Sequence, residues 1–187
     1  MKLIVGISGA SGVLLGYKFL QTLKTLPNIE THLIISEGAA VNFNLETNLT
    51  QKEVENYADY VYSNKNLAAA ISSGSFAVDA MIIIPCSMKT VSGIANGYAE
   101  NLLQRAADVC LKENRKIIIV PREMPFNRIH LKNMLFLSEC GCVIIPPMLT
   151  FYNAPQTMED QINHIIGKVL AQLNINYKNF KKWNGVE

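Results

Sequence analysis

Short apolar runs alternate with stretches of helical periodicity along the chain. The runs cover residues 3–7, 31–35, 80–84, 116–120 and 143–145, and each is followed at once by Ser or Pro. Helical patterns cover residues 13–26, 91–95, 101–113, 129–138 and 157–173. Continuous apolar runs are typical of strands buried on both faces of a sheet. The alternation predicts one α/β domain over residues 1–187, with a doubly wound, mainly parallel sheet and helices on both faces.

Weaker signals lie between these elements. Thr50 and Glu53 form a capping-box pattern, which predicts a peripheral helix. Residues 67–71 predict a short Ala-rich helix, and the run over 80–84 is expected to stop at Pro85. The Ser-Ser-Gly-Ser segment at 72–75 predicts a loop that is either a plain connector or flexible enough to approach a ligand.

Composition narrows the class of protein. Hydrophobic residues make up 49% of the chain and charged residues 17%, below the usual charged share of about 25%, so we expect contacts between subunits. The net charge of +2 is scattered, which argues against a nucleic-acid or membrane partner. Cys86, Cys110, Cys140 and Cys142 form no Cys-x-x-Cys pair and are expected to be reduced. The first apolar run is too short for a signal peptide, so a cytoplasmic protein is expected.

The turn after the first run carries the first candidate chemistry. Gly6, Gly9 and Gly12, with Ser8 and Ser11 between them, join a strand to a helix. The spacing differs from the usual dinucleotide-binding fingerprint. Free amides at the helix start nevertheless suit an anion such as a phosphate.

Polar residues follow three more apolar runs. Ser36 follows the second run and is either a ligand contact or the N-cap of the next helix. Residues 87–90 follow the third run, and Arg122 with Glu123 follows the fourth, between two prolines. The carboxyl ends of parallel strands meet at one edge of a sheet. Four polar loops along one edge therefore predict a ligand longer than a phosphate, such as FMN.

Charged and aromatic residues elsewhere admit two interpretations each. The basic residues of interest lie beside apolar elements: Arg105, Lys112, Arg122 and Lys168. Each is either an ordinary surface charge or an anion ligand. Glu123 is either a paired surface carboxylate or a general acid–base group. Tyr152 is either core packing or part of a site, and Trp183 is either a loose anchor or a lid over an apolar ligand.

Metal and hydrolytic sites find little support in the sequence. His32, His130 and His164 are far apart, and Cys140 with Cys142 is more typical of two small core residues than of a ligand pair. No Gly-x-Ser-x-Gly segment occurs with a His in the required order. No bound metal is expected.

A set of short motifs gives the chain a resemblance to a known family. The motifs are Gly9-Ala10-Ser11-Gly12, residues 85–90, Asn101-Leu102-Leu103 with 105–109, Arg122-Glu123 with Pro125-Phe126, His130-Leu131, Asn133-Met134 and Phe151-Tyr152. In this order they resemble the UbiX-like flavin prenyltransferases of the flavin-binding decarboxylase superfamily. The resemblance covers nearly the whole chain, from Ile4 to Trp183.

The resemblance implies a flavodoxin-like or Rossmann-like subunit that assembles into a homo-oligomer, a dodecamer built from trimers with active sites between subunits. It implies metal-independent transfer of the dimethylallyl group of dimethylallyl phosphate to N5 and C6 of reduced FMN. The prenylated FMN would then serve UbiD-like decarboxylases.

The resemblance also assigns residues to the site. The expected FMN contacts are Gly9, Ala10, Ser11, Ser36, Ser87, Met88, Lys89, Thr90 and Arg122. The expected substrate contacts are Tyr152 and Lys168 at the prenyl phosphate and Trp183 at the apolar end, with residues 174–187 as a tail that covers the site. The expected catalytic residues are Ser11, Glu46, Arg105, Lys112 and Glu123. Some members have Arg at position 168, and Lys keeps the charge without the bidentate fork.

Two alternative functions have less support in the sequence. A flavin-dependent cysteine decarboxylase of the same superfamily needs a catalytic His in mid-chain and a Pro-x-Met-Asn segment. Here no His lies between His32 and His130, and Asn133-Met134 stands in another context. A non-catalytic FMN-binding protein should not need a second anion site, which argues against the second alternative.

Overall fold

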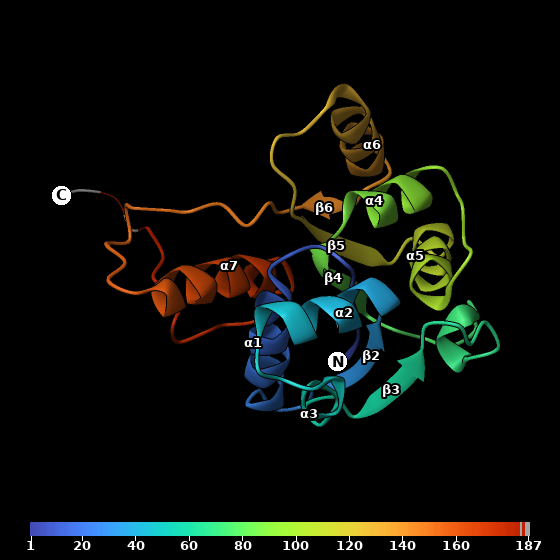
Figure 1. Cartoon of the computed structure of the whole chain (residues 1–187), viewed down its shortest axis with the longest axis horizontal. Helices are drawn as coiled ribbons and strands as arrows, with labels where there is room; N and C mark the ends of the chain where they lie inside the picture. The colour runs from blue at the N-terminus through green and yellow to red at the C-terminus, as the bar shows by residue number, and fades with distance from the viewer. Residues whose placement is uncertain (184, 186–187) are drawn as a thin grey trace.

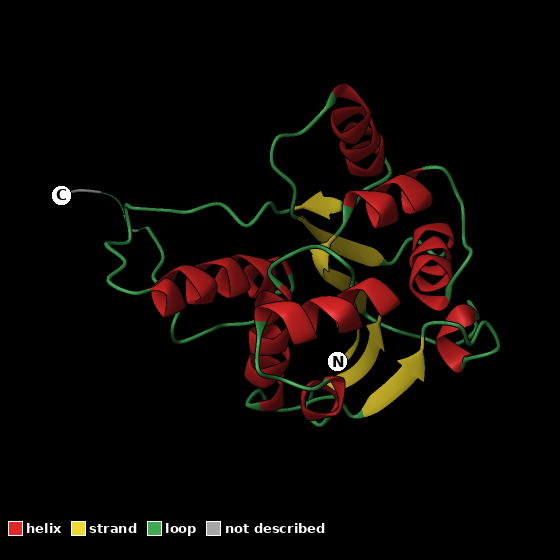
Figure 2. Ribbon diagram, in the orientation of Figure 1, coloured by secondary structure: helices red, strands yellow, loops and turns green. Residues whose placement is uncertain are grey.

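The computed structural model describes residues 1–183 and 185, which form one parallel sheet with helices on both faces (Figures 1 and 2). The described residues contain six strands in the order β3-β2-β1-β4-β5-β6, and every neighbouring pair is parallel. The strands are β1 (Lys2–Ile7), β2 (Glu30–Ile35), β3 (Tyr60–Ser63), β4 (Ala80–Cys86), β5 (Lys116–Pro121) and β6 (Val143–Ile144). The expected doubly wound α/β fold is confirmed.

The helices divide between two hydrophobic cores, one on each face of the sheet. They are α1 (Val13–Lys24), α2 (Glu37–Glu46), α3 (Gln51–Glu55), the 3-10 turn η1 (Ala70–Ser72), α4 (Met88–Ala95), α5 (Leu102–Lys112), α6 (Arg128–Glu139) and α7 (Met158–Gln172). One core joins α1, α2 and α7 to the sheet, and the other joins α4, α5 and α6. Figure 1 shows α1 and α7 on one side and α4, α5 and α6 on the other.

Burial explains which strands the hydrophobic pattern predicted. Every residue of β4 is buried, and so are five of the six residues of β1 and of β2. The edge strand β3, with the sequence Tyr-Val-Tyr-Ser, is mostly exposed. An edge strand needs no continuous apolar run, and the sequence pattern therefore missed β3.

Two expected boundaries were wrong, and one expected cap is confirmed. Strand β4 continues through Pro85 to Cys86, and its register against β5 shifts between Ile83 and Cys86. Such an irregularity accommodates a proline, which has no N–H for the ladder. The expected helix over 67–71 is only the 3-10 turn η1. The capping box of Thr50 and Glu53 is present at the start of the short helix α3.

The Ser-Ser-Gly-Ser loop is a connector that hydrogen bonds from two arginine side chains hold in place. The carbonyl of Ser72 accepts a hydrogen bond from Arg105 Nε at 3.2 Å. The carbonyls of Gly74 and Phe76 accept from Arg115 at 2.6 Å and 2.9 Å. These bonds hold the loop beside α5 on its way to the start of β4. Among the described residues, no helix is both long enough and apolar enough to span a membrane.

Candidate active site

The carboxyl ends of β1 and β4 lie at the point where the strand order reverses. The chain leaves β1 toward β2 and β3, then returns to place β4 on the other side of β1. Ligands of open α/β sheets bind in the crevice at such a point. Ser8 joins the two strand ends, because its N–H donates to the Pro85 carbonyl at 3.1 Å and its Oγ accepts from Ser87 N–H at 2.7 Å. Ser8 is 1% exposed, so its role is structural.

The turn after β1 passes very close to the start of α2. A Cβ placed on Gly9 would lie 3.0 Å from Gly38 Cα, and one placed on Gly38 would lie 3.2 Å from Gly9 Cα. Both glycines are exposed on their other side. A side chain at either position would therefore push the two backbones apart. The expected contact at Gly9 fits this arrangement, whereas Gly38 was missed because its partner lies 29 residues away in the sequence.

The start of α1 is occupied by a carboxylate of the chain itself. Gly12, the N-cap residue, has φ 95° and no side-chain cap. Glu46 at the end of α2 supplies the missing acceptor, since its Oε2 accepts from Gly12 N–H at 2.7 Å and from Val13 N–H at 3.4 Å. A carboxylate of the chain itself thus stands where an anion was expected at this helix start. Glu46 is held at the residue that follows Ser11, and the catalytic roles of both stay predictions.

Helices α2 and α4 present two more N-termini at this edge. Ser36 is the N-cap of α2, and its Oγ accepts from Ala39 N–H at 3.2 Å. The capping interpretation of Ser36 is therefore confirmed, and its contact with FMN stays a prediction. The amide of Glu37 and the side chain of Asn64 hold the pKa of the Glu37 carboxyl below its ordinary value, with smaller contributions from Lys65 and Lys89.

At α4, Ser87 is the N-cap and its Oγ accepts from Thr90 N–H at 3.3 Å. The two hydroxyls also bond to each other at 3.1 Å. Lys89 is exposed, whereas the Met88 side chain is buried in the core. Of the expected contacts here, Met88 can offer a ligand only its backbone. We call residues 8–12, 36–39 and 87–90, together with Arg122, the cradle.

Arg122 links the cradle to an apolar pocket. Its Nε donates to the Ser11 carbonyl at 3.2 Å, and its backbone N–H donates to the Cys86 carbonyl at 3.0 Å. The pocket has a volume of about 510 Å³ and is lined by residues 121–126 and 146–149. Glu123 lies in its wall, with Oε1 accepting from Met124 N–H at 3.1 Å. Arg122 and Glu123 thus stand where a polar edge meets an apolar cavity.

A second group of expected site residues lies on three neighbouring segments: α7, the tail, and residues 145–157. We call residues 145–157 the arm. Figure 1 shows the arm leaving β6, projecting away from the sheet and returning as α7. Tyr152 Oη lies 3.2 Å from His164 Nε2, and Trp183 meets the Tyr152 ring edge-on at 5.8 Å between centroids. Lys168 Nζ lies 5.7 Å from the centroid of the Phe180 ring. The structure thus gathers Tyr152, Lys168 and Trp183.

Arg105 and Lys112 are not brought to either group within one chain. Arg105 pairs with Asp108 at 2.7 Å, and Lys112 pairs with Glu113. Helix α5 runs back toward the edge where the strands begin, so Lys112, at its end, lies far from the cradle. Figure 1 shows α5 and α7 on opposite sides of the molecule. The motif resemblance assigns both residues to the site, but within a single chain neither lies near the other expected site residues.

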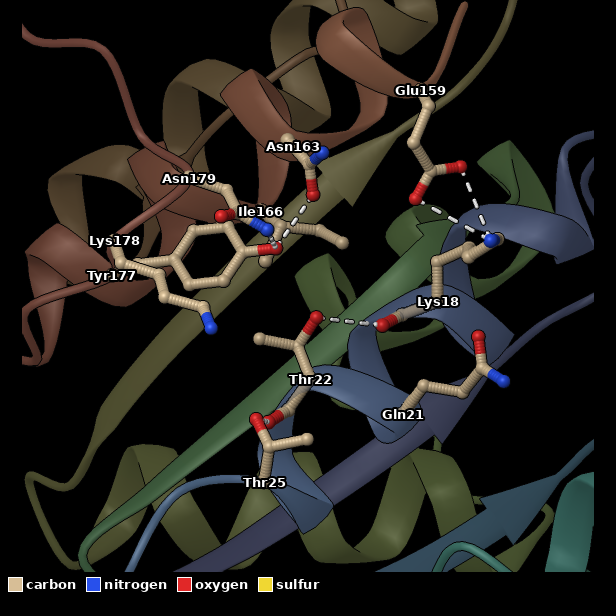
Figure 3. A pocket seen from close by; sticks show the side chains of 10 residues that line it. All are labelled: Lys18, Gln21, Thr22, Thr25, Glu159, Asn163, Ile166, Tyr177, Lys178 and Asn179. Atoms are coloured by element: carbon tan, nitrogen blue, oxygen red, sulfur yellow. Dashed lines mark hydrogen bonds and ion pairs between the residues drawn. The ribbon is translucent and has the colours of Figure 1, made fainter.

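The described part of the tail runs back along α7. Tyr177 Oη donates to Asn163 Oδ1 at 2.5 Å, and a Cβ on Gly167 would overlap the Phe180 ring. A cavity of about 260 Å³ lies between the tail, α1 and α7. Figure 3 shows the side chains that line it, among them Lys18 paired with Glu159. The tail thus contacts the arm through Trp183. The expectation of a cover over 174–187 remains a prediction, and residues 184, 186 and 187 lie outside the described part.

Residue types that hold metals do not gather anywhere in the described part of the chain, where no three His, Cys, Asp or Glu side chains converge. The cysteines lie mostly in the cores. Burial raises the pKa of the Cys110 and Cys142 thiols to about 11. These thiols stay protonated and pack as small apolar groups.

Comparison with known proteins gives concordant matches. The flavoprotein family matches residues 1–174. A probable UbiX-like flavin prenyltransferase from Sedimentibacter hydroxybenzoicus is 65% identical over 187 residues, covering 100% of this chain and 99% of the relative. The crystal structure of a dodecameric FMN-dependent UbiX-like decarboxylase from Escherichia coli O157:H7 has a TM-score of 0.97 and 50% identity, covering 99% of this chain and 100% of that one.

A second solved structure, AnUbiX (PadA1) in complex with FMN and dimethylallyl pyrophosphate, has a TM-score of 0.96 and 42% identity, covering 100% of this chain and 98% of that one. The matches run along the whole chain and agree with its topology, which confirms the family that the motifs resembled. The chain belongs to the flavoprotein family and, within it, to the UbiX-like flavin prenyltransferases.

Proposed function

We propose that this protein is a flavin prenyltransferase, which joins the dimethylallyl group of dimethylallyl phosphate to N5 and C6 of reduced FMN. The observation that carries the proposal is the full-length identity of 65% to a probable UbiX-like flavin prenyltransferase. The solved complex of a 42% identical relative with FMN and dimethylallyl pyrophosphate adds support for both ligands.

The cradle fits FMN on its own geometry. The close approach of Gly9 and Gly38 leaves backbone groups open to a flat ligand, and Ser36, Ser87 and Thr90 stand at two helix N-termini that favour a phosphate. Lys89 adds a positive charge there. Since Glu46 fills the start of α1 and the Glu37 carboxylate bonds to an amide in the first turn of α2, the FMN phosphate is proposed to bind at the start of α4, with the ring toward Ser11 and Arg122.

The second substrate needs donors for its phosphate and an apolar space for its prenyl group. Tyr152 and Lys168 supply a hydroxyl and a positive charge, with Arg105 and Lys112 as further cations. Donors fixed where negative charge develops are an effective source of catalysis. The apolar pocket beside Arg122 excludes water from the dimethylallyl group, whose allylic carbon becomes electron-poor as the phosphate leaves.

Reduced FMN would supply the nucleophilic nitrogen and the ring carbon that accept the prenyl group. The chain's own contribution to proton movement is assigned to Glu123 and Ser11. The Glu123 carboxylate is aimed by its bond from Met124 N–H and can hold a proton on a carboxyl oxygen. Glu123→Gln should therefore lower the rate of product formation at every pH.

The separation of the site residues supports an active site between subunits. The arm exposes large apolar side chains, among them Leu149 at 61% and Phe151 at 76%, and such a patch marks a contact surface. A similar protein from Escherichia coli O157:H7 is dodecameric. We propose a homododecamer in which the arm and α5 of neighbouring copies complete each cradle. We further propose that the protein acts in the cytoplasm and delivers prenylated FMN to a UbiD-like decarboxylase.

One experiment tests the reaction directly. Purified protein is incubated without oxygen with reduced FMN and dimethylallyl phosphate, and the extracted flavin is weighed by mass spectrometry. The expected product carries one added dimethylallyl unit. Recovery of unmodified FMN from folded, FMN-loaded protein would contradict the proposal.

A further inference from the structure

His164 is a buried histidine that the assigned site residues do not include. It lies on α7, is 3% exposed and is covered by the Phe180 ring, whose centroid is 5.3 Å away. Its Nε2 lies 3.2 Å from Tyr152 Oη, and its Nδ1 lies 3.4 Å from Asn153 Nδ2. Both ring nitrogens thus meet consecutive residues of the arm.

The orientation of the Asn153 amide gives these bonds a direction. Its oxygen faces Thr150, whose Oγ1 donates to Asn153 Oδ1 at 3.1 Å, and its nitrogen faces His164. Thr150 is itself held on α7, because its N–H donates to Gln161 Oε1 at 3.1 Å and its carbonyl accepts from Gln161 Nε2 at 2.8 Å. The Asn153 amide nitrogen therefore faces His164 as a donor.

A donor at Nδ1 sets the tautomer of a neutral imidazole. Nδ1 of His164 must accept from Asn153, so the ring proton sits on Nε2 and points to the Tyr152 oxygen. Burial lowers the pKa of His164, and the nearby Lys168 charge lowers it further, so both favour the neutral ring. The Tyr152 oxygen then acts as an acceptor, and its own O–H is left to donate outward.

We propose that His164 is a positioning residue that turns the Tyr152 hydroxyl into a donor for the phosphate of the prenyl substrate. The inference rests on the proposed function, which brings that phosphate to Tyr152 and Lys168. His164 and Lys168 are four residues apart on α7 and so share one face of the helix. A hydroxyl that accepts one hydrogen bond donates a stronger one, so the chain from Thr150 to Tyr152 strengthens this contact.

Three substitutions at His164 separate this role from simple packing. His164→Gln keeps an N–H close to the position of Nε2, His164→Asn moves it toward the position of Nδ1, and His164→Phe fills the space without a donor. We expect the KM for dimethylallyl phosphate to rise roughly ten-fold or more in the Asn and Phe variants and to stay near wild type in the Gln variant. FMN affinity should be unchanged in all three. Equal KM changes in the Gln and Phe variants would overturn the proposal.

The tautomer can be measured without any activity. Histidine-labelled protein, loaded with FMN, is examined by ¹⁵N solid-state NMR, with the His164→Gln spectrum identifying the His164 signals. We expect the neutral Nε2–H form in the wild type. In Asn153→Asp the carboxylate would accept from the ring, and we expect a shift to Nδ1–H or to the doubly protonated ring. A wild-type Nδ1–H tautomer would overturn the proposal.

Binding of inorganic phosphate to the FMN-loaded protein separates this inference from the proposed function. We expect the affinity to fall in Tyr152→Phe and His164→Phe and to persist in His164→Gln. If the wild type shows this pattern and the Nε2–H tautomer but transfers no prenyl group, only the proposed function fails. If the wild type transfers the prenyl group but phosphate affinity is the same in the wild type and in every His164 variant, only this inference fails.

Discussion

The cradle and the arm are built in opposite ways. The cradle is made largely of backbone, and its parts are bonded to each other within one chain: Ser8 joins two strand ends and Glu46 closes a helix start. The arm contributes mainly side chains to the proposed site, and its large apolar residues are exposed. Under the proposed function, the contrast means that one chain builds the FMN cradle by itself, whereas the site for the prenyl donor also takes residues from a neighbouring copy.

The largest expected effect tests that division of the site. Lys112→Ala and Ser11→Ala should each lower kcat by about 10²–10³, because each removes a donor near developing charge. Mixed oligomers formed by refolding or co-expressing the two variants should recover roughly one quarter of the wild-type rate, since random mixing then gives some sites both native residues.

The control for that experiment is a mixture of each variant with itself, which should stay inactive. Anaerobic turnover of reduced FMN measures the outcome. In a single chain, α5 lies far from the cradle, so Lys112 is expected to reach the cradle of a neighbouring copy. Mixed oligomers that show no recovery would contradict this, because they would mean that one chain supplies both Lys112 and Ser11 to a site.

The next effect concerns the cradle alone. Gly9→Val should weaken FMN binding roughly ten- to hundred-fold, because even its Cβ would lie 3.0 Å from the Gly38 backbone and overpacking costs about 1–3 kcal/mol. Gly6→Ala is the control: its Cβ would meet side chains and no backbone, Leu103 at 3.1 Å and Ile83 at 3.7 Å. We expect Gly6→Ala to keep FMN. Equal losses in fluorescence titrations of the two variants would show that the close approach at Gly9 has no special role.

The two regions also differ in how well the sequence predicted them. The buried strands of the cradle appear as continuous apolar runs, and polar residues directly after them predicted the ligand edge. The exposed strand β3 left no such run. Gly38 and Glu46 act across 29 and 34 residues of chain, and local patterns do not show such pairings.

The arm was predictable only through the motif resemblance. Tyr152 and Lys168 carry no local signal, because nothing in their neighbouring residues says that the chain turns back and packs Phe180 and His164 against them. The residue pattern likewise left Lys112 as either a surface charge or an anion ligand. Residues whose partners lie on another element, or on another copy, are found by family motifs or by structure.

A smaller effect is expected from pH on the stability of the contact between α7 and the arm. Burial and Lys168 lower the pKa of His164 on α7 below its usual 6.5, so the folded state favours the neutral ring. The stabilisation is present above that usual value and is lost as pH falls through the lower pKa of the folded state, where the ring must take up a proton. The melting temperature of the wild type should therefore fall more steeply on acidification than that of His164→Gln. Parallel melting curves over roughly pH 5 to 8 would contradict this assignment.

The smallest expected effect distinguishes charge from geometry at the prenyl phosphate. Lys168→Arg keeps the positive charge and adds a planar fork that can grip a phosphate with two hydrogen bonds. The Phe180 ring, already 5.7 Å from Lys168 Nζ, would support the flat guanidinium by stacking. We expect the KM for dimethylallyl phosphate to fall roughly three-fold, with FMN affinity unchanged. Lys168→Met, which removes the charge, is the matched control and should raise KM instead. If Lys168→Arg and Lys168→Met both leave KM at the wild-type value, then residue 168 does not touch the phosphate, and the arm contributes to this reaction through Tyr152 alone.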